Sequence, residues 1–446
     1  MNFLVIGGDA AGMSAASRAK RNQPDLNVTV LEKTADVSYS ACGMPYNIAD
    51  PDRSIEDLVV RRAEVFRNKQ GIELLTGIEA TAIDPAGATV STRDAEGQAR
   101  RFSYDNLLIA TGATPITPDI PGIDLPGVMV LKNLAHGRAI KQFIDQWAVK
   151  KTVIIGMGYI ALEMCEALRK RGIAVDMVKP RKMFLPWMEG RLAEQVKTEL
   201  EANRVGVYPG HAVEKIEKAN GRLAVIGPTL TLEADLVLVA IGVAPASDLA
   251  VAAGLQTSLG GAIAVDARQR TSDKSIYAAG DCADAFHVVT GQRTWIPLAL
   301  RANRAGWAVA DNVCGIDRRL AGVVGSAVFK VFNFQVARTG INEAEAREAG
   351  LEPASVVIKS RSRAHAHPGA SDIWVHMVGD RGSGRLLGVQ MVGHDGVAHR
   401  LHAPAVALHG HMTVEQFSQM DLAYAPPFGP TWDPMLTAAN QLLKRL

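Results

Sequence analysis

The feature that most constrains the fold is a pattern that occurs twice: a short apolar run that ends in a glycine-rich turn and continues into a helix. The first copy spans residues 3–21, and the second spans residues 151–171. Glycines in such a turn let backbone N–H groups approach a pyrophosphate, and the positive end of the helix attracts it. The repeat therefore predicts an α/β chain with two Rossmann-like dinucleotide-binding domains.

The two copies differ at the end of the strand that follows each helix. The first copy ends in Glu32, which is suited to hydrogen-bond the hydroxyls of a ribose. The second ends in Lys179, with Arg181 close behind, and cations there favour a ribose 2′-phosphate. We therefore expect NADPH to be preferred over NADH, although both can be used. A solvated basic turn is the alternative.

Composition narrows the possible classes of protein. The 446 residues carry 48 basic and 46 acidic side chains, which gives no charge block for nucleic acid or an anionic membrane. No apolar run reaches spanning length and no signal-peptide pattern is present, so we expect a cytoplasmic protein. The four cysteines form no CxxC pair, so neither a metal site nor a disulfide framework is indicated.

One of these cysteines, Cys42, follows the first glycine turn closely. Pro45 lies where it suits the first turn of a helix, and the positive end of that helix is expected to lower the pKa of the thiol. Such a thiolate can attack a disulfide and hold a mixed disulfide. The alternative is a small buried core residue.

Two later segments return to the same pattern. Residues 234–242 resemble residues 107–112, and residues 276–281 form another strand that ends in Asp281, which can bind a polyol hydroxyl or serve as an ordinary turn residue. A helix after residue 297 is expected to return to the first domain. The predicted domains are residues 1–112 with 246–320, residues 113–245, and an α+β domain over residues 321–446.

The motifs in order carry a resemblance that spans essentially the whole chain. They are Gly7 to Gly12, Glu32-Lys33, Ser40 to Tyr46, Ala110 to Ala113, Gly156 to Ala161, Ala278 to Asp281 and Tyr424 to Phe428. The set is similar to the flavoprotein pyridine nucleotide-disulfide oxidoreductases. It most closely resembles their single-cysteine branch, which contains coenzyme A (CoA) disulfide reductases and CoA-dependent persulfide or polysulfide reductases.

The resemblance implies FAD in the first domain, NAD(P)H in the second and a C-terminal domain that forms a homodimer. Hydride would pass from the nicotinamide to the flavin, and electrons would pass on to Cys42. The implied FAD residues are Gly7, Gly8, Ala11, Gly12, Glu32, Lys33, Ala80, Ala110, Gly112, Asp281, Pro297, Leu298 and Ala299. The implied NAD(P)H residues are Gly156, Gly158, Tyr159, Ile160, Glu163, Lys179, Arg181 and Gly242.

A CoA site is predicted on the first helix. Ser14, Arg18 and Arg21 form one polar stripe, and arginine binds phosphate through its guanidinium fork. With Ser38 and Lys69, these residues also lie where the resemblance places CoA, as a substrate or a bound cofactor. A solvated basic stripe is the alternative.

The resemblance also places Tyr424 near Cys42 of the other subunit, as a proton donor. Relatives commonly carry tyrosine before the Pro-Gly of this domain, where this chain has His367. Two rival functions remain. One is an NADH oxidase or peroxidase that cycles Cys42 through a sulfenic acid, against which Ala10 stands where such relatives keep histidine. The other is a redox-sensing flavoprotein that acts through a partner.

Overall fold

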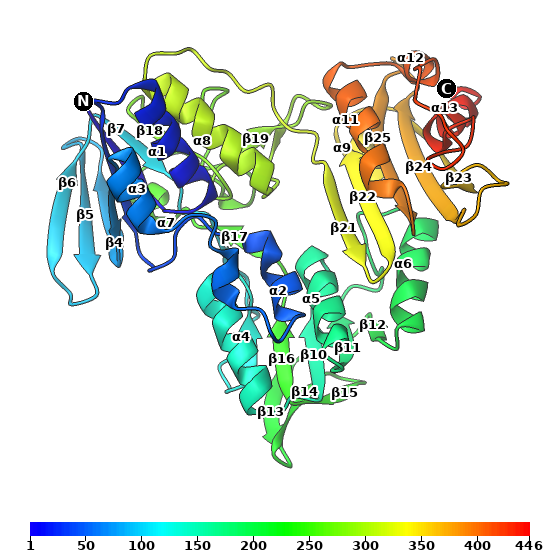
Figure 1. The fold of residues 1–446 in the computed structure, drawn as a ribbon, viewed down its shortest axis with the longest axis horizontal. Helices are drawn as coiled ribbons and strands as arrows, with labels where there is room; N and C mark the ends of the chain where they lie inside the picture. The colour runs from blue at the N-terminus through cyan, green and yellow to red at the C-terminus, as the bar shows by residue number, and fades with distance from the viewer.

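The structure is a computed structural model that describes residues 1–446. It is built around three five-stranded sheets, two parallel and one antiparallel, which confirms the predicted α/β fold. Figure 1 shows the N-terminal sheet at the left, the second sheet at the bottom and the C-terminal sheet at the right. No helix has both the length and the apolar character that a membrane crossing requires.

The first sheet has the strand order β18-β7-β1-β2-β3, so residues far apart in sequence complete it. With the segments that connect its strands, this sheet forms the first unit of the molecule. In chain order its elements are β1 (Asn2–Ile6), α1 (Ala10–Asn22), β2 (Asn27–Glu32), α2 (Met44–Ile48), α3 (Ala63–Gln70), β3 (Glu73–Thr76), β7 (Asn106–Ile109), α7 (Asp248–Ala252), β18 (Ile276–Ala278) and α8 (Ala299–Val313). Smaller sheets beside it are formed by β4 (Ile78–Asp84), β5 (Thr89–Asp94) and β6 (Ala99–Ser103), and by β19 (Ala285–Phe286) with β20 (Arg293–Thr294).

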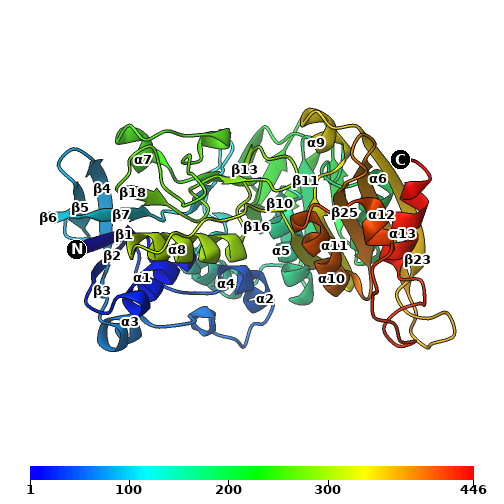
Figure 2. The ribbon, with the colours of Figure 1, turned by 90° about the horizontal axis from the view of Figure 1, so that it is seen from above.

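Strand β1 is buried on both faces, which explains its unbroken apolar run. Phe3 and Val5 belong to the core shared with α1 and α8, whereas Leu4 and Ile6 belong to the core on the opposite face. Helices α1 and α8 lie side by side over the first of these cores (Figure 2). The sheet therefore fixes the position of the first glycine turn, which begins directly after Ile6.

The second sheet has the order β12-β11-β10-β16-β9 and repeats this arrangement. With its helices this sheet forms the second unit. In chain order its elements are β9 (Val128–Val130), α4 (Leu134–Gln146), β10 (Lys151–Ile155), α5 (Tyr159–Lys170), β11 (Ala174–Lys179), α6 (Gly190–Ala202), β12 (Gly206–Pro209) and β16 (Leu236–Val239). A small antiparallel sheet flanks it, formed by β13 (Lys215–Ala219), β14 (Arg222–Ile226) and β15 (Thr231–Ala234). Strands β8 (Ala113–Pro115) and β17 (Val243–Pro245) pair where the chain leaves and re-enters the first unit.

The C-terminal part is an antiparallel sheet with the order β21-β22-β25-β24-β23. Its elements are β21 (Ala327–Val331), β22 (Phe334–Gly340), α9 (Glu343–Glu348), β23 (Pro353–Arg361), β24 (Asp372–Asp380), β25 (Leu386–Gly393), α10 (Val397–Arg400), α11 (His402–His409), α12 (Val414–Ser418) and α13 (Pro434–Leu443). Buried residues of α11, α12 and α13 share one core with the strands of this sheet.

Candidate active site

The first glycine turn is shaped by close backbone approach. Gly7 has φ +110°, and a Cβ there would lie 2.2 Å from the carbonyl oxygen of Ala110, so only glycine fits. Gly8 donates its N–H to Glu32 Oε2 at 2.7 Å. Asp9 precedes α1 but makes no side-chain capping bond, so the N–H groups of the first turn remain available. These features fit a pyrophosphate at this turn.

The Glu32 carboxylate is held from two sides, because its other oxygen accepts the backbone N–H of Thr34 at 2.7 Å. Lys33 is exposed beside it. Ala11 is buried where α8 crosses α1, since a Cβ on Gly306 would lie 2.2 Å from its carbonyl oxygen. Ala80 lies on β4 at an irregularity of the pairing with β5. Glu32, the acid predicted to bind a ribose, thus lies at the end of β2 beside the first glycine turn.

Asp281 lies near the start of α8. Its Oδ2 accepts a hydrogen bond from Lys132 Nζ at 3.2 Å, and its carbonyl oxygen accepts one from Trp295 Nε1 at 2.8 Å. Helix α8 begins after Leu298, again without a side-chain cap, so the N–H groups of its first turn remain available. Gly112, with φ +72°, has open space around the position of a Cβ. Gly112 and Asp281 thus lie just beyond the carboxyl ends of β7 and β18, two parallel strands of the first sheet.

The second turn repeats the geometry of the first. Gly156 has φ +126°, a Cβ there would lie 2.1 Å from the carbonyl oxygen of Ala240, and Gly158 faces open space. Helix α5 begins after Gly158 with no side-chain cap. Ile160 is exposed at 38%, and Gly242, with φ +132°, follows β16. This open, uncapped turn fits a second dinucleotide.

Tyr159, the first residue of α5, is packed among aromatic rings. Its ring centroid lies 4.9 Å from that of Phe329 and 5.4 Å from that of Trp187. Phe329 belongs to the C-terminal sheet, so the helix start is anchored between two parts of the molecule. One turn later, Glu163 accepts a hydrogen bond from the Tyr46 hydroxyl at 2.9 Å. Residues predicted to bind the nucleotide thus contact both neighbouring units.

The basic turn after β11 is only partly free. Lys179 Nζ donates to the carbonyl oxygen of Phe184 at 2.9 Å, and desolvation together with nearby Arg181 lowers the pKa of Lys179. Arg181 and Lys182 are exposed. The exposed pair is therefore better placed for a phosphate than Lys179 itself.

Cys42 lies on the short 3₁₀ turn Ala41–Gly43 that leads into α2. The thiol is free, as are those of Cys165, Cys282 and Cys314, but Cys42 alone is exposed. Helix α2 packs into the core of the second unit, although it precedes β3 of the first unit in sequence (Figure 1). Cys42 thus lies where the two units meet.

The expected lowering of the Cys42 pKa is wrong in direction. Partial desolvation raises the pKa of the thiol, and the carboxylates of Glu163 and Asp281 raise it further, against a smaller opposite effect of Lys132. Helix α2 has only five residues, and a helix this short has a weak macrodipole. Since Glu163 comes from α5 and Asp281 follows β18, both units act on this sulfur.

The predicted CoA stripe is largely occupied by contacts within the chain. Arg18 donates from Nε and Nη2 to the buried Asp311 of α8 at 2.6 and 2.9 Å, and Ser14 donates to Asn303 Oδ1 at 2.5 Å. Arg21, by contrast, is exposed. The stripe thus holds α1 to α8, with Arg21 as its one exposed member.

Ser38 lies beyond the carboxyl end of β2, whereas Lys69 lies in the last turn of α3, just before the start of β3. Ser38 has φ +48°, and its carbonyl oxygen accepts the N–H of Val60 at 2.8 Å. Lys69 is exposed on α3. These two residues and Arg21 remain the accessible members of the predicted CoA set.

Tyr424 is 50% exposed on the loop between α12 and α13, together with Phe428 at 79% and Trp432 at 64%. The N–H of Ala364 donates to the carbonyl oxygen of Pro426 at 3.1 Å, which joins this loop to the one that carries His367. Figure 2 shows both loops projecting from the C-terminal unit, away from α2. Within one chain, Tyr424 and Cys42 are therefore not brought together.

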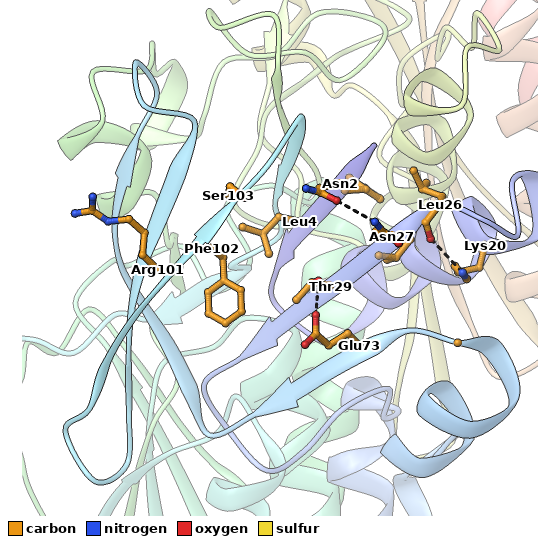
Figure 3. A pocket seen from close by; sticks show the side chains of 13 residues that line it. Asn2, Leu4, Lys20, Leu26, Asn27, Thr29, Glu73, Arg101, Phe102 and Ser103 are labelled. Atoms are coloured by element: carbon orange, nitrogen blue, oxygen red, sulfur yellow. Dashed lines mark hydrogen bonds between the residues drawn. The ribbon is translucent and has the colours of Figure 1, made fainter.

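A surface pocket of about 420 Å³ lies elsewhere, at the starting ends of β1, β2 and β3 (Figure 3). Its polar side chains are bonded among themselves: Asn27 donates to Asn2 at 3.1 Å, and Thr29 donates to Glu73 at 2.8 Å. Arg101 points away from the other lining side chains. Ligands of parallel sheets bind at the opposite, carboxyl ends, so the pocket is separate from the candidate site.

Sequence reasoning missed three residues that shape the site. Asp9 accepts the N–H of Tyr39 at 3.3 Å, and burial raises its pKa to about 6. Lys132 reaches Asp281 from the loop after β9. Arg301, buried in α8, donates to the carbonyl oxygen of Ala283 at 2.7 Å and orders the segment after Asp281. Lys132 and Arg301 lie outside the sequence motifs, and although Asp9 lies within the first glycine turn, its partner Tyr39 is distant along the chain.

No group of three or more His, Cys, Asp or Glu side chains could hold a metal ion.

Two family models match the chain: "pyridine nucleotide-disulphide oxidoreductase" over residues 1–306, and the dimerisation domain of that family over residues 326–435.

Individual known proteins are similar over the full length. A CoA-dependent NAD(P)H sulfur oxidoreductase of Pyrococcus abyssi is 36% identical over 98% of this chain and 97% of its own. An NADH oxidase of Methanocaldococcus jannaschii is 32% identical over 100% of this chain and 99% of its own. The structure of an NAD-dependent persulfide reductase from A. fulgidus superimposes with a TM-score of 0.96 at 37% identity, over 100% of this chain and 83% of that one.

Proposed function

The chain belongs to the pyridine nucleotide-disulphide oxidoreductase family, and from this premise we propose that it is an FAD-dependent NAD(P)H reductase of CoA disulfide, CoA persulfide or polysulfide sulfur. The observation that carries the proposal is the position of Cys42. An accessible free thiol lies between the two glycine turns, where acids of both units act on it. A redox cysteine that receives electrons from one side and a sulfur substrate from the other needs such a position.

The sulfur chemistry follows from a single cysteine. The Cys42 thiolate attacks one sulfur of CoA disulfide, which forms a mixed disulfide and releases one CoA thiolate that takes up a proton. Bound FAD supplies the path for two electrons from NAD(P)H. Their arrival breaks the mixed disulfide, restores Cys42 and releases the second CoA, so that NAD(P)H, one proton and CoA disulfide yield NAD(P)⁺ and two CoA thiols.

Three different sets of residues are proposed to hold FAD, NAD(P)H and CoA. The FAD residues are those of the first turn with Glu32 and Asp281, and the NAD(P)H residues are those of the second turn with Glu163. Arg21 and Lys69 are the exposed cations proposed for CoA phosphates, whereas the Arg18 side chain is 27% exposed and paired with Asp311. CoA dependence is supported by the similarity to the Pyrococcus abyssi protein, which is named a CoA-dependent NAD(P)H sulfur oxidoreductase.

A homodimer and a preference for NADPH are parts of the same proposal. The exposed aromatic residues around Tyr424 form an apolar surface that a second copy would cover, and this copy would carry Tyr424 to the partner's Cys42. The exposed Arg181 and Lys182 favour the 2′-phosphate. The four unpaired cysteines agree with a reducing, cytoplasmic compartment.

An NADH oxidase is the second candidate, because one relative that matches the full chain bears that name. It requires Cys42 to cycle through a sulfenic acid. The first turn offers Ala10 where the oxidase and peroxidase pattern has histidine, which favours disulfide or persulfide chemistry.

The test is anaerobic consumption of NADPH by the FAD-loaded protein, with CoA disulfide, CoA persulfide, peroxide or no acceptor in parallel assays, followed by an aerobic assay without acceptor. Turnover with a CoA species only is the expected result. Turnover with peroxide or oxygen only would establish the oxidase, and no turnover with any acceptor would favour the redox sensor. The Cys42→Ser variant is the control: it should keep NADPH-dependent bleaching of the flavin and lose turnover.

A further inference from the structure

The helix that carries the candidate redox cysteine cannot hold its own position. Helix α2 has five residues, far fewer than an isolated helix needs. Met44 and Ile48 are buried at 3% and 0% in the core of the second unit, together with Ile140 and Ile144 of α4. The position of Cys42 is therefore set by the second unit through α2, in addition to the first unit, whose Asp9 holds the preceding Tyr39.

Oxygen atoms at and just beyond the carboxyl-terminal end of α2 surround the ammonium group of one lysine. Nζ of Lys141, on α4, lies 3.1 Å from the carbonyl oxygen of Asn47 and 3.3 Å from its Oδ1. The same nitrogen lies 2.8 Å from the carbonyl oxygen of Asp50 and 2.6 Å from that of Arg53. Three N–H groups thus serve four oxygens, in the manner of a bound cation.

The acceptors around Lys141 are themselves fixed. Asn47 is fully buried, and its amide donates to the carbonyl oxygen of Ser54 at 2.8 Å, so both ends of this side chain are occupied. Arg171, at the end of α5, donates to the carbonyl oxygen of Ile48 and pairs with Asp145. The last carbonyl groups of a helix lack hydrogen-bond donors within the helix. At the end of α2, two cations of the second unit, Lys141 and Arg171, act as these donors.

A second residue of α4 holds the other side of the same segment. Arg138, three residues before Lys141, donates to both oxygens of Asp36 at 2.8 and 2.7 Å and to Glu56 at 2.6 Å. Asp36 precedes Cys42 in sequence and Glu56 follows it. The chain around the cysteine is thus bound to one face of α4 at two points.

We propose that Lys141 is a positioning residue for Cys42: its ammonium closes the oxygen cage at the end of α2 and fixes the sulfur to the unit that carries the second glycine turn. The inference rests on the proposed role of Cys42 as the redox cysteine. It assigns a requirement for a cation, not merely for a side chain that fills space. A hydrophobic residue at 141 would leave Oδ1 of the buried Asn47 and the carbonyl oxygen of Asp50 without a donor from α4.

The test uses the Lys141→Ala variant of the FAD-loaded protein, which leaves room for a small amine. The readout is the rate at which Cys42 reacts with 4,4′-dithiodipyridine, a disulfide that releases a coloured thione. We expect this rate to fall by about tenfold, because the exposure on which the reactivity of this thiol depends is set by where α2 holds it. Propylammonium should restore it, whereas tetramethylammonium at equal ionic strength, which has no N–H, should not.

Three controls separate positioning from a loss of folding. Lys150→Met removes an exposed lysine of the same unit and should leave the rate unchanged. The flavin content and the rate of flavin bleaching by NADPH should stay within about twofold of the wild type, since the second glycine turn is untouched. Lys141→Arg keeps the charge but not the compact shape, and should react at an intermediate rate; it replaces the alanine variant if that variant does not fold.

A normal Cys42 rate in Lys141→Ala would overturn the proposal. A slow rate that propylammonium does not restore, or a parallel loss of flavin and of bleaching, would also overturn it, because either result describes a structural role only. The outcome is independent of the proposed substrate. A wild-type protein that turns over no CoA disulfide, but whose Cys42 reactivity still depends on Lys141 and amine, would refute the function and retain the positioning role.

Discussion

The two glycine turns are nearly identical in backbone and opposite in charge. In each, the first glycine has a positive φ, and a Cβ there would lie 2.1–2.2 Å from a carbonyl oxygen at the end of the neighbouring strand. The first turn, however, is bonded to the carboxylate of Glu32 at the end of β2, whereas β11, the corresponding strand of the second copy, is followed by the exposed cations Arg181 and Lys182. One architectural unit is thus used twice, and the ends of β2 and β11 decide what each copy binds.

The helix starts reinforce this comparison. Among the helices of ten or more residues, α1, α5 and α8 begin without side-chain caps, whereas α4, α6 and α13 are capped by Asn133, Glu189 and Asp433. Uncapped N–H groups are available to anionic ligands, and capped ones are not. The long helices that start at the proposed cofactor sites are the ones left uncapped.

The largest effects are expected when the first glycine of each turn is replaced separately by alanine. Gly7→Ala should weaken FAD binding, and Gly156→Ala should raise the KM for NADPH, each by about a hundredfold, because the new Cβ meets a backbone carbonyl. Flavin titration of the apoprotein and steady-state kinetics measure the two effects. Gly190→Ala, at an open helix start, is the control. Loss of both cofactors in either variant would contradict two separate sites.

Removing the acid tests the first turn alone. Glu32→Gln keeps the size of the side chain but loses the charged acceptor for Gly8, so FAD binding should weaken by roughly 2 kcal/mol. The KM for NADPH should stay unchanged. Fluorescence titration of FAD measures the loss, with Glu73→Gln on the neighbouring strand as the matched control. Equal FAD affinity in wild type and variant would show that Glu32 has no role in this site.

Asp9 stands where the second turn has Gly158, and the difference predicts a pH effect. Burial raises the pKa of Asp9 from 3.8 to about 6, so the folded apoprotein loses stability as pH rises through this range. Asp9→Asn removes the buried charge. Its stability advantage over wild type should widen by roughly 1 kcal/mol between about pH 5 and about pH 8. Urea unfolding of the apoprotein at both pH values is the measurement, and a constant difference would contradict the prediction.

The basic turn should give the smallest effect, because its cations are exposed. Arg181→Glu combined with Lys182→Glu should lower kcat/KM for NADPH by about fivefold and leave that for NADH almost unchanged. Lys150→Glu controls for the change in net charge. Parallel kinetics with the two nucleotides decide the matter: equal losses would mean that this turn does not recognise the 2′-phosphate.

Local patterns were readable from the sequence, whereas partnerships over long distances were not. Both strand, turn and helix units and the basic end of β11 appear where the repeat predicts them, because glycine spacing and apolar runs act within a few residues. The pairing of Arg18 with Asp311 joins residues 293 positions apart, and no periodicity announces it. The stripe on α1 therefore looked free in sequence and is mostly occupied in the fold.

The environment of Cys42 shows the same limit. The segment Ser40 to Pro45 predicted a short helix after the thiol, and the helix is present. The direction of the pKa shift depended on Glu163 and Asp281, which come from other parts of the chain. Likewise, the packing of α2 on α4 through Lys141 could not be foreseen, because α2 lies in sequence among the elements of the first unit.

The central claim is that Cys42 alone carries the substrate sulfur. Its most direct test is the intact mass of the oxidised protein after exposure to CoA disulfide, followed by peptide mapping. We expect one CoA per chain, attached to Cys42, released by NADPH, and absent in Cys42→Ser. A chain that gains no CoA, or one that carries it on Cys165, Cys282 or Cys314, would contradict the claim.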